Sequence, residues 1–359
     1  MKPKTVLLGM SGGVDSSVAA LLLKEKGYNV IGIFMKNFSD SKNPLTGECS
    51  YIEDQKMAKR IANILKIKLI IKDSEREFKK YVINPLFNSY SRGLTPNPDI
   101  LCNKIIKFPI LWEEAKKIKA DYIATGHYAR IKKTNSGLQL LTGKDKTKDQ
   151  SYFLAELSQY DLSHTLFPNG NLKKSQVREI AKTNKFPNYN KKSTSGICFV
   201  GKLNLKSFLE KKIKNKQGKV LDEKGNLLGF HPGIMYFTIG QRIGPKLGFE
   251  ISKKVNKKFY VAEKRDNNTI IVVPKNHPLL RKRIIKIKSL HIINPKENLQ
   301  KLNLKARIRH LGKLHSGKLI KQNNIHSFIF KKPVEAIAEG QFIVLYYKDR
   351  VIASGEIRV

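Results

Sequence analysis

The sequence predicts a doubly wound α/β domain over about the first 200 residues, followed by a small β-rich domain and a C-terminal β-barrel. Three observations indicate this order. Helical and strand-like apolar patterns alternate up to about residue 200, helical periodicity nearly disappears beyond Phe199, and strand-like runs dominate from about Lys286. Because 359 residues exceed one domain of ordinary size, we expect domains at residues 1–205, 206–277 and 278–359.

The first unit of the chain has a strand, a helix and a second strand. Residues 5–10 read as a short apolar strand, and residues 14–26 carry apolar side chains at helical spacing until Gly27 ends the helix. Residues 29–35 form the second strand, which implies a parallel sheet with a right-handed crossover. The alternation then continues with helices at residues 54–65, 78–91 and 105–118 and strands at residues 68–72 and 122–125.

The rest of the chain reads as β structure. Strand-like stretches separated by glycine turns are expected at residues 219–220, 222–228, 234–239 and 259–261. The final block has strand-like runs at the spacing of a small barrel, at residues 304–310, 327–330, 342–347 and 351–359. Residues 211–219 and 274–278 are expected linkers.

The chain is strongly basic. Lys and Arg total 69 against 29 Asp and Glu, a formal net charge of +40, which favours nucleic acid as a partner. A coding bias toward Lys, Asn and Ile would give the same charge without a ligand, so the motifs must decide. There is no run of roughly 18 apolar residues and no signal peptide, so we expect a cytoplasmic protein without a membrane segment.

The three cysteines do not form a metal or disulfide pattern. Cys49, Cys102 and Cys198 are odd in number, widely spaced and without a CxxC pair, which argues against a secreted disulfide framework and against a zinc site. No permanent metal or iron–sulfur cluster is therefore expected. For each cysteine alone, a small buried apolar side chain is the simplest interpretation.

A glycine-rich turn follows the first strand. Residues 9–17, GMSGGVDSS, connect that strand to its helix, where unpaired backbone N–H groups and the positive end of the helix dipole converge. Glycines let the backbone approach phosphate oxygens, and Ser11, Ser16 and Ser17 can add hydroxyl donors. The sequence therefore predicts an anion site, although a tight connection alone would also use such residues.

The turn lacks the lysine that follows the second glycine of a Walker loop. That lysine serves transfer of the γ-phosphoryl group, so its absence favours a loop that holds pyrophosphate while the α-phosphorus is attacked. Asp15 would repel phosphates unless a divalent cation bridges them, which implies ATP with Mg²⁺.

The residues around two of the cysteines favour a chemical role for each. Cys102 follows the turn-forming Asn97-Pro98-Asp99 and enters a helix, whose N-terminus favours a reactive thiolate. Cys198 lies in a small-residue turn flanked by glycines, which could move toward a partner.

The string SGGVDSS resembles the pyrophosphate-loop signature of the ATP-pyrophosphatase superfamily, whose members adenylate a carbonyl or amide oxygen. The resemblance implies a doubly wound sheet of the adenine-nucleotide α-hydrolase type. It also implies that Met35 and Gly126 border the adenosine and that the loop holds the phosphates, through Gly9, Met10, Ser11, Gly12, Gly13, Val14, Asp15 and Ser16.

Together with both cysteines, the sequence closely resembles the tRNA-uridine 2-sulfurtransferases, the 2-thiouridylases of the wobble position. The resemblance covers essentially the whole chain, with matching stretches at residues 97–99, 102–104, 124–128, 148–152, 196–199 and 238–242. It implies a nucleophile at Cys102, a persulfide carrier at Cys198 and contacts to the target base from Asn97, Pro98 and Asp99. The implied tRNA contacts are His127, Lys148, Asp149, Gln150, Arg309, His310 and Gln341.

The family chemistry implies a reaction sequence. ATP adenylates the C2 oxygen of the wobble uridine, a sulfur-donor protein loads Cys198, and Cys102 attacks that persulfide. The step frees sulfide or leaves a Cys102–Cys198 disulfide. We expect a monomer that binds one tRNA.

The chain departs from the family pattern at three places. Ile105 stands where a glutamate is usual, Ser193-Thr194-Ser195 replaces Asp-Ser-Thr, and His310 replaces a tyrosine. Two other functions remain open from the residues alone: a pyrophosphate-loop ligase that adenylates a small molecule, and a non-catalytic RNA-binding protein. Enzymes that make 2-thiocytidine use CxxC pairs, and those that make 4-thiouridine carry an RNA-binding domain ahead of the loop, so both fit poorly.

Overall fold

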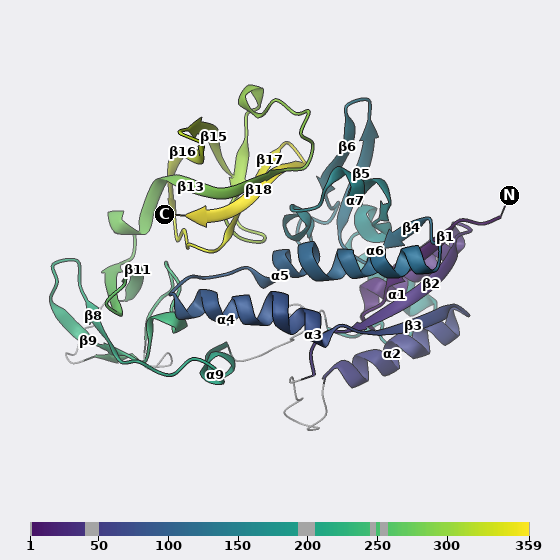
Figure 1. Ribbon diagram of the computed structural model, residues 1–359, viewed down its shortest axis with the longest axis horizontal. Coiled ribbons are helices and arrows are strands. Elements are labelled where there is room, and N and C mark those ends of the chain that lie inside the picture. Colours follow the sequence, from purple (N-terminus) through teal and green to yellow (C-terminus); the bar gives the residue numbers. More distant parts are fainter. Residues whose placement is uncertain (1, 40–49, 193–204, 245–248, 252–257, 359) are drawn as a thin grey trace.

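The computed structural model describes residues 2–39, 50–192, 205–244, 249–251 and 258–358. Three sheets organise these residues: a parallel sheet near the N-terminus, a small mixed sheet in the middle and a large antiparallel sheet that contains the C-terminus (Figure 1). The predicted order of an α/β domain, a small β-rich domain and a β-barrel is therefore confirmed. Among the described residues, no helix is both long and apolar enough to cross a membrane.

The N-terminal sheet has five parallel strands in the order β3-β2-β1-β4-β7. Their bounds are β1 Thr5–Gly9, β2 Asn29–Lys36, β3 Lys68–Asp73, β4 Tyr122–Ala124 and β7 Thr165–Leu166. Side chains alternate between the two faces of β1. Leu8 packs with helices α1 (Val14–Glu25) and α2 (Ser50–Ile64), whereas Leu7 packs with the helices that carry Phe78 and Cys102. Helices thus cover both faces, as a doubly wound sheet requires.

Two long helical stretches each contain a π-helical segment. In the first, α3 (Glu75–Phe78) continues through η1 (Lys79–Ile83) into α4 (Asn84–Ser91). In the second, α5 (Pro98–Leu101) continues through η2 (Cys102–Lys107) into α6 (Phe108–Lys117). Proline follows each π segment by two residues, at Pro85 and Pro109. A proline lacks an N–H and clashes with the carbonyl four residues earlier, so a locally widened helix accommodates it. The second helix therefore begins earlier than predicted and includes Cys102.

The middle sheet has the strand order β10-β9-β8-β12-β11. Its strands are β8 Gly218–Leu221, β9 Leu227–His231, β10 Glu250–Ile251, β11 Phe259–Arg265 and β12 Thr269–Pro274. The strand predicted at residues 222–228 is wrong over its first part, because the carboxylate of Asp222 accepts hydrogen bonds from the N–H groups of Lys224 and Asn226 and closes a turn. The strand predicted at residues 234–239 is also wrong. Ile234–Tyr236 is a 3₁₀ turn, whose first N–H bonds to the side chain of Asn268.

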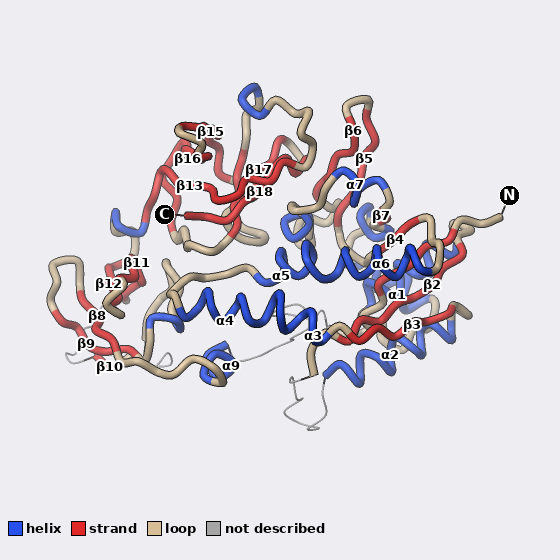
Figure 2. Tube along the Cα trace, viewed as in Figure 1, coloured by secondary structure: helices blue, strands red, loops and turns tan. Residues whose placement is uncertain are grey.

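Six strands of the C-terminal sheet close into a barrel (Figure 2). They follow the order β13-β16-β15-β14-β17-β18, and β18 pairs back to β13. Apolar side chains such as Phe328 and Ile343 fill the interior. The bounds are β13 Arg281–Ile292, β14 Lys305–Arg307, β15 His315–Gln322, β16 Ile325–Glu335, β17 Phe342–Tyr347 and β18 Arg350–Arg358.

A hairpin from the N-terminal half extends the barrel sheet. Strands β5 (Ala129–Thr134) and β6 (Gly137–Thr142) follow β4, and β6 pairs with β18 at Leu141 and Arg350. The sequence analysis did not predict this hairpin. The remaining helices are α7 Gln159–Ser163, α8 Lys174–Thr183 and α9 Leu205–Glu210.

A buried ion pair also joins the barrel to the N-terminal half. The carboxylate of Asp149 is fully buried, and it accepts hydrogen bonds from the N–H groups of Gly143 and Ser151, both at 3.1 Å, and from Arg307 of β14 at 2.7 Å. The Arg307 guanidinium lies over the ring of Tyr346, 5.1 Å from its centroid. Both carboxylate oxygens of Asp149 therefore have partners. The bond from Arg307 fixes the barrel against the N-terminal half of the chain.

Replacing Arg307 by leucine tests that contact. Removing one partner of a buried ion pair leaves the other charge uncompensated and costs about 3–5 kcal/mol. We expect Arg307→Leu to lower the free energy of unfolding by this amount in urea denaturation followed by circular dichroism. Arg309→Leu, at an exposed position two residues away, is the matched control and should change it by less than about 0.5 kcal/mol. Similar losses in both variants would contradict a stabilising role for the pair.

Candidate active site

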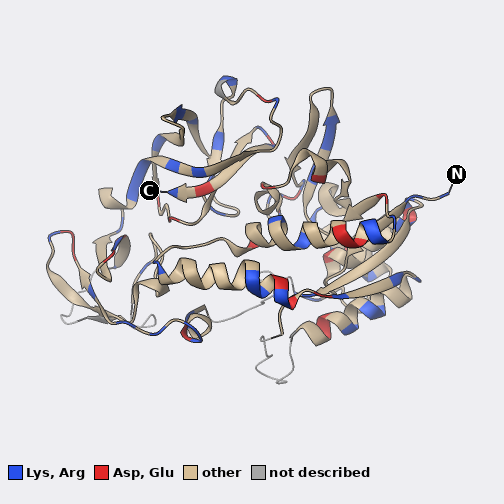
Figure 3. Ribbon diagram, in the orientation of Figure 1, with Lys and Arg blue, Asp and Glu red and all other residues tan. Residues whose placement is uncertain are grey.

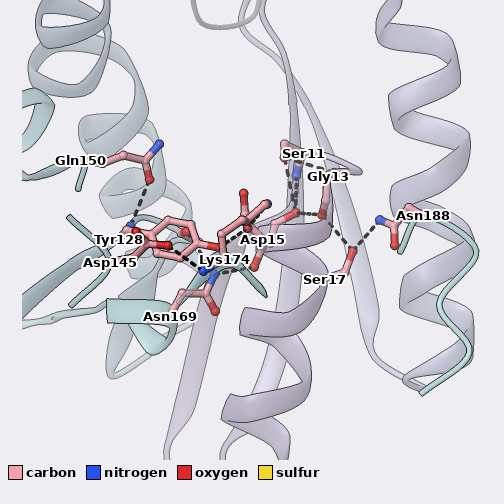
Figure 4. Close-up of polar contacts among 12 residues, drawn as sticks. Ser11, Gly13, Asp15, Ser17, Tyr128, Asp145, Gln150, Asn169, Lys174 and Asn188 are labelled. Atoms are coloured by element: carbon pink, nitrogen blue, oxygen red, sulfur yellow. Dashed lines mark hydrogen bonds and ion pairs between the residues drawn. The ribbon is translucent and has the colours of Figure 1, made fainter. Parts of the chain in front are cut away.

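The glycine-rich loop lies at the carboxyl end of the central strand β1 and leads into α1 (Figure 4). The N-cap residue of α1 is Gly13, which has no side chain to bond the first N–H groups of the helix. These N–H groups and the positive end of the helix dipole suit an anion. The geometry at the loop is therefore that of a phosphate site.

Serine hydroxyls shape the loop from within. Ser16 accepts a hydrogen bond from the N–H of Ser11 at 3.2 Å and donates to the carbonyl of Gly13 at 3.0 Å. Ser17 donates to the same carbonyl at 3.0 Å and accepts from the amide of Asn188 at 2.9 Å. The hydroxyls of Ser16 and Ser17 thus hold the loop conformation, a role that the sequence analysis did not foresee.

Asp15 is paired with a lysine. Its carboxylate accepts hydrogen bonds from Lys174 of α8 at 2.5 Å and from the hydroxyl of Tyr128 at 2.6 Å (Figure 4). Burial and the nearby Asp15 charge raise the pKa of Tyr128, which keeps the phenol protonated as a donor. Asp15 therefore has a cationic partner within the chain, which the sequence analysis did not predict, and the divalent cation expected beside it stays a prediction. Lys174 thus places a cation beside the loop, although the loop itself contains no lysine.

The other residues predicted to bind ATP lie at the same edge of the sheet. Gly126 follows β4 and packs so closely on α1 that an added Cβ would lie 2.8 Å from the carbonyl carbon of Asp15. The side chain of Asn169 donates to the backbone oxygens of both residues, at 2.8 Å to Asp15 and 3.1 Å to Gly126. Met35 is buried near the carboxyl end of β2, and the N–H of Met10 bonds to the carbonyl of Ile33 in that strand. The structure thus brings together the loop, Met35 and Gly126.

Cys102 lies on the opposite face of the sheet from α1. It is the first residue of η2, is 1% exposed and packs in the apolar cluster that contains Leu7 and Ile33. The helix begins after Asn97, whose side chain accepts from the N–H of Ile100 at 3.2 Å. A substrate therefore reaches the thiol only after local opening of this cluster. Cys49 and Cys198 lie outside the described residues.

A barrel residue supports the segment that precedes this helix. The amide of Gln341 donates to the carbonyls of Thr95 at 3.0 Å and Pro96 at 3.2 Å, and it accepts from Asn97 at 3.4 Å. Two of the residues predicted to contact tRNA or its target base, Asn97 and Gln341, are therefore in direct contact. Pro98 and Asp99 form the first turn of α5.

His127 is tied to the helix of Cys102. Its Nδ1 lies 2.7 Å from the hydroxyl of Thr125 and its Nε2 lies 3.5 Å from the amine of Lys107 in η2. Its ring stacks against Phe108, with centroids 6.5 Å apart. Burial and the Lys107 charge lower the pKa of His127 well below its ordinary value, so the imidazole is neutral. His127 can therefore contact RNA by hydrogen bonding but not as a cation.

The remaining residues predicted to contact tRNA differ in exposure. Lys148 and Arg309 are exposed, whereas Asp149 is fully buried in its pair with Arg307 and presents no atom to an RNA. A tRNA contact from Asp149 stays a prediction, and it would require this ion pair to open. Gln150 bonds the backbone of Tyr128 through its side chain at 3.0 Å.

His310 uses its imidazole for stacking. The ring lies 4.1 Å from that of Phe153, centroid to centroid, and burial lowers the pKa of His310 to about 4. The substitution of histidine for the family's tyrosine therefore keeps a neutral aromatic ring at this position.

A buried carboxylate lies beside the cysteine helix. Glu156, whose side chain is 4% exposed, pairs with Lys104 at 2.7 Å and accepts from the hydroxyl of Ser354 in β18 at 2.5 Å. Sequence reasoning missed Glu156, because one acid in a loop gives no local signal. Ile105, which replaces the usual glutamate, is 38% exposed. An acid from another segment therefore pairs with Lys104 of the cysteine helix.

The described residues contain no cluster of three or more His, Cys, Asp and Glu side chains that could hold a metal ion. The one carboxylate of the loop, Asp15, already has two partners. A divalent cation that enters with the nucleotide therefore stays a prediction.

Comparisons with known proteins identify the family. Family models match three segments: a tRNA methyl transferase HUP domain at residues 4–202, a tRNA methyl transferase PRC-barrel domain at 206–274 and an aminomethyltransferase β-barrel domain at 282–357. The tRNA-specific 2-thiouridylase MnmA 1 of Geobacillus kaustophilus is 42% identical over 99% of this chain and 96% of its own length. The chain belongs to the tRNA-specific 2-thiouridylase family.

Other relatives have the same name and similar coverage. The enzymes named tRNA-specific 2-thiouridylase MnmA from Karelsulcia muelleri and Coxiella burnetii are 40% and 39% identical, each over 99% of this chain, and the matches cover 99% and 98% of their own lengths. Likeness to solved structures is weak. A 4-thiouridine synthetase in complex with RNA and bound ATP has a TM-score of 0.38 at 16% identity, over 58% of this chain and 50% of that one.

Gly12 offers a direct test of the loop. It has a φ of +71°, and an added Cβ would lie 2.2 Å from the carbonyl oxygen of Asp54, so alanine forces the loop away from α2. We expect Gly12→Ala to weaken pyrophosphate binding roughly tenfold or more in titration calorimetry. Gly27→Ala is the matched control, because Gly27 also has a positive φ, +80°, but nothing within 4 Å of an added Cβ. Equal pyrophosphate affinity in both variants would place the anion elsewhere.

Proposed function

We propose that this protein uses ATP to activate the C2 oxygen of the wobble uridine in tRNA and replaces that oxygen with sulfur carried as a cysteine persulfide. The observation that carries the proposal is a lysine-free phosphate loop at the end of β1, with Cys102 packed against the same sheet. Relatives of matching length, 39–42% identical, bear the name tRNA-specific 2-thiouridylase, which supports this activity.

The loop holds the phosphates of ATP through the backbone N–H groups at the start of α1, and Lys174 adds positive charge beside Asp15. Attack by the C2 oxygen on the α-phosphorus yields an adenylated uridine and pyrophosphate. The oxygen then leaves with AMP when sulfur attacks C2. Mg²⁺ enters with ATP and neutralises part of the phosphate charge.

The two cysteines divide the sulfur chemistry. A persulfide donor protein loads Cys198, and the thiolate of Cys102 attacks the inner sulfur of that persulfide. This forms a Cys102–Cys198 disulfide and releases hydrosulfide, which attacks C2 and displaces the oxygen with AMP; an external thiol then reduces the disulfide. Gln341 contacts Asn97 just before the start of the cysteine helix, and Asn97 to Asp99 meet the target base there. Neutral His127 contacts the same helix further along, at Lys107. Glu156 fixes Lys104 on the same helix.

The basic surface binds the tRNA backbone. Lysine and arginine are spread over the parallel-sheet domain, the hairpin β5–β6 and the barrel (Figure 3), and the net charge is +40. Exposed Lys148 and Arg309 belong to this surface. We further propose a cytoplasmic monomer with domains at residues 1–205, 206–277 and 278–359.

Single cysteine variants test the relay. Cys198→Ser should lose persulfide loading but still release pyrophosphate when tRNA is present, because activation precedes sulfur delivery. Cys102→Ser should keep the persulfide and make no 2-thiouridine. Labelled sulfur on the protein, pyrophosphate release and 2-thiouridine in the tRNA are the three measurements.

Cys49→Ser is the control for these variants and should behave as the unmodified chain. Normal thiolation by the Cys198→Ser protein, or labelled sulfur on Cys49, would contradict the relay. Pyrophosphate release that does not depend on tRNA would favour a ligase for a small molecule, and the absence of any release would favour a non-catalytic RNA-binding protein.

A further inference from the structure

Two buried polar side chains at one edge of the parallel sheet lack hydrogen-bond partners. Asn37 is 2% exposed, and neither its amide nitrogen nor its amide oxygen has a partner among the described residues. The hydroxyl of Ser74, which is fully buried, also has none. Leaving a buried polar group unpaired costs about 1–3 kcal/mol. Three such atoms in one place indicate that a ligand completes them.

Both residues follow strands whose carboxyl ends lie at the same edge of the sheet as the glycine-rich loop. Asn37 comes directly after β2 and Ser74 directly after β3. These two strands lie side by side in the sheet (Figure 1). The N–H of Ser74 bonds to the carbonyl of Lys36 at 2.9 Å, which brings the two strand ends together. Ligands of open α/β sheets bind at the carboxyl ends of the strands.

The segments that contain Asn37 and Ser74 also carry a charged group and aromatic rings. The amine of Lys36 is paired with two carboxylates, Asp73 at 3.3 Å and Glu75 at 2.7 Å, so this group has a net negative charge that disfavours an anionic ligand. The ring of Phe38 packs against Phe78, with centroids 6.3 Å apart. An uncharged heterocycle with hydrogen-bonding edges suits this environment better than a phosphate or a carboxylate does.

Strand register gives the distance from the phosphate loop. Gly9, the last residue of β1, lies opposite Ile33 in β2, and Asn37 is four residues further along. At a rise of about 3.3 Å per residue, Asn37 lies roughly 13 Å beyond the end of β1. A nucleotide with its phosphates on the loop can therefore extend its base past Met35 toward the ends of β2 and β3.

We propose that Asn37, assisted by Ser74, hydrogen-bonds the edge of the adenine ring and thereby selects ATP over other nucleoside triphosphates. An asparagine amide presents one donor and one acceptor side by side, which matches the exocyclic amine and adjacent ring nitrogen of adenine. At the same edge guanine presents two acceptors, O6 and N7, which the one donor and one acceptor of an amide cannot both satisfy. This inference rests on the proposed function only for the assignment of the loop to ATP.

The test uses the full chain and measures binding of ATP, GTP and pyrophosphate by titration calorimetry. Asn37→Leu keeps the side-chain volume and removes both hydrogen-bonding groups. We expect ATP affinity to fall about 10- to 100-fold and the preference for ATP over GTP to shrink, since a bidentate contact to a base discriminates by this factor. Pyrophosphate affinity should not change. Ser74→Ala should also lower ATP affinity, but by a smaller factor.

In the absence of nucleotide, the leucine variants of Asn37 and of a control asparagine should differ in their thermal midpoints. Asn37→Leu should leave the thermal midpoint unchanged or raise it, because it removes unpaired buried atoms. Asn294 is also buried, but its amide donates to the carbonyl of Ser136 at 2.8 Å and accepts from the N–H of Lys296 at 3.1 Å. Asn294→Leu should therefore lower the midpoint and leave the ATP-to-GTP preference intact.

Unchanged ATP affinity in Asn37→Leu would overturn the inference. If that variant binds ATP normally but makes no 2-thiouridine, the subsite serves the target uracil and the adenine assignment is wrong. If the unmodified chain binds ATP through Asn37 but never thiolates tRNA, the proposed function fails and the adenine assignment stands.

Discussion

A buried ion pair between Asp149 and Arg307 holds the C-terminal barrel against the parallel-sheet domain, and the proposed active site depends on that contact. Two barrel side chains reach the neighbourhood of Cys102: Gln341 at the segment before its helix and Ser354 through Glu156. If the barrel changed its orientation relative to the parallel-sheet domain, neither Gln341 nor Ser354 would keep its position. The pairing of β6 with β18 adds a second attachment. In the proposed mechanism, the barrel is therefore part of the active site and not a separate binding module.

Shape and charge at the phosphate loop come from different parts of the chain. The conformation of Gly12 and the internal bonds of Ser16 set the shape, whereas Lys174 supplies the cation from a helix 159 positions beyond Asp15. The hydroxyl of Tyr128 holds the same carboxylate. A lysine outside the loop leaves the glycines free to approach the pyrophosphate closely. This arrangement suits chemistry at the α-phosphorus, where pyrophosphate is the leaving group.

Local patterns predicted the elements whose signals are local. The strand, loop and helix at the start of the chain and the strands of the barrel followed from apolar periodicity and glycine placement, because these features are encoded within a few residues. Contacts between distant segments gave no such signal. One lysine among 69 basic residues could not be assigned to Asp15, and nothing in the sequence near β6 indicated its partner β18.

The same limit applied to individual site residues. Asp149 lies in a stretch that resembles a tRNA contact, but its burial depends on Arg307 from the barrel. Ile234–Tyr236 form a 3₁₀ turn whose first N–H bonds to Asn268, which comes about thirty positions later. Asn37 became notable only once its burial and lack of partners were known.

Isotope transfer from the tRNA tests the central claim most directly. A tRNA whose wobble uridine carries a heavy oxygen isotope at C2 would be thiolated by the purified protein with ATP and a persulfide donor, and the AMP analysed by mass spectrometry. Adenylation of the C2 oxygen predicts that the heavy oxygen leaves in the phosphate of AMP. Unlabelled AMP, or ADP with inorganic phosphate in place of AMP with pyrophosphate, would contradict it.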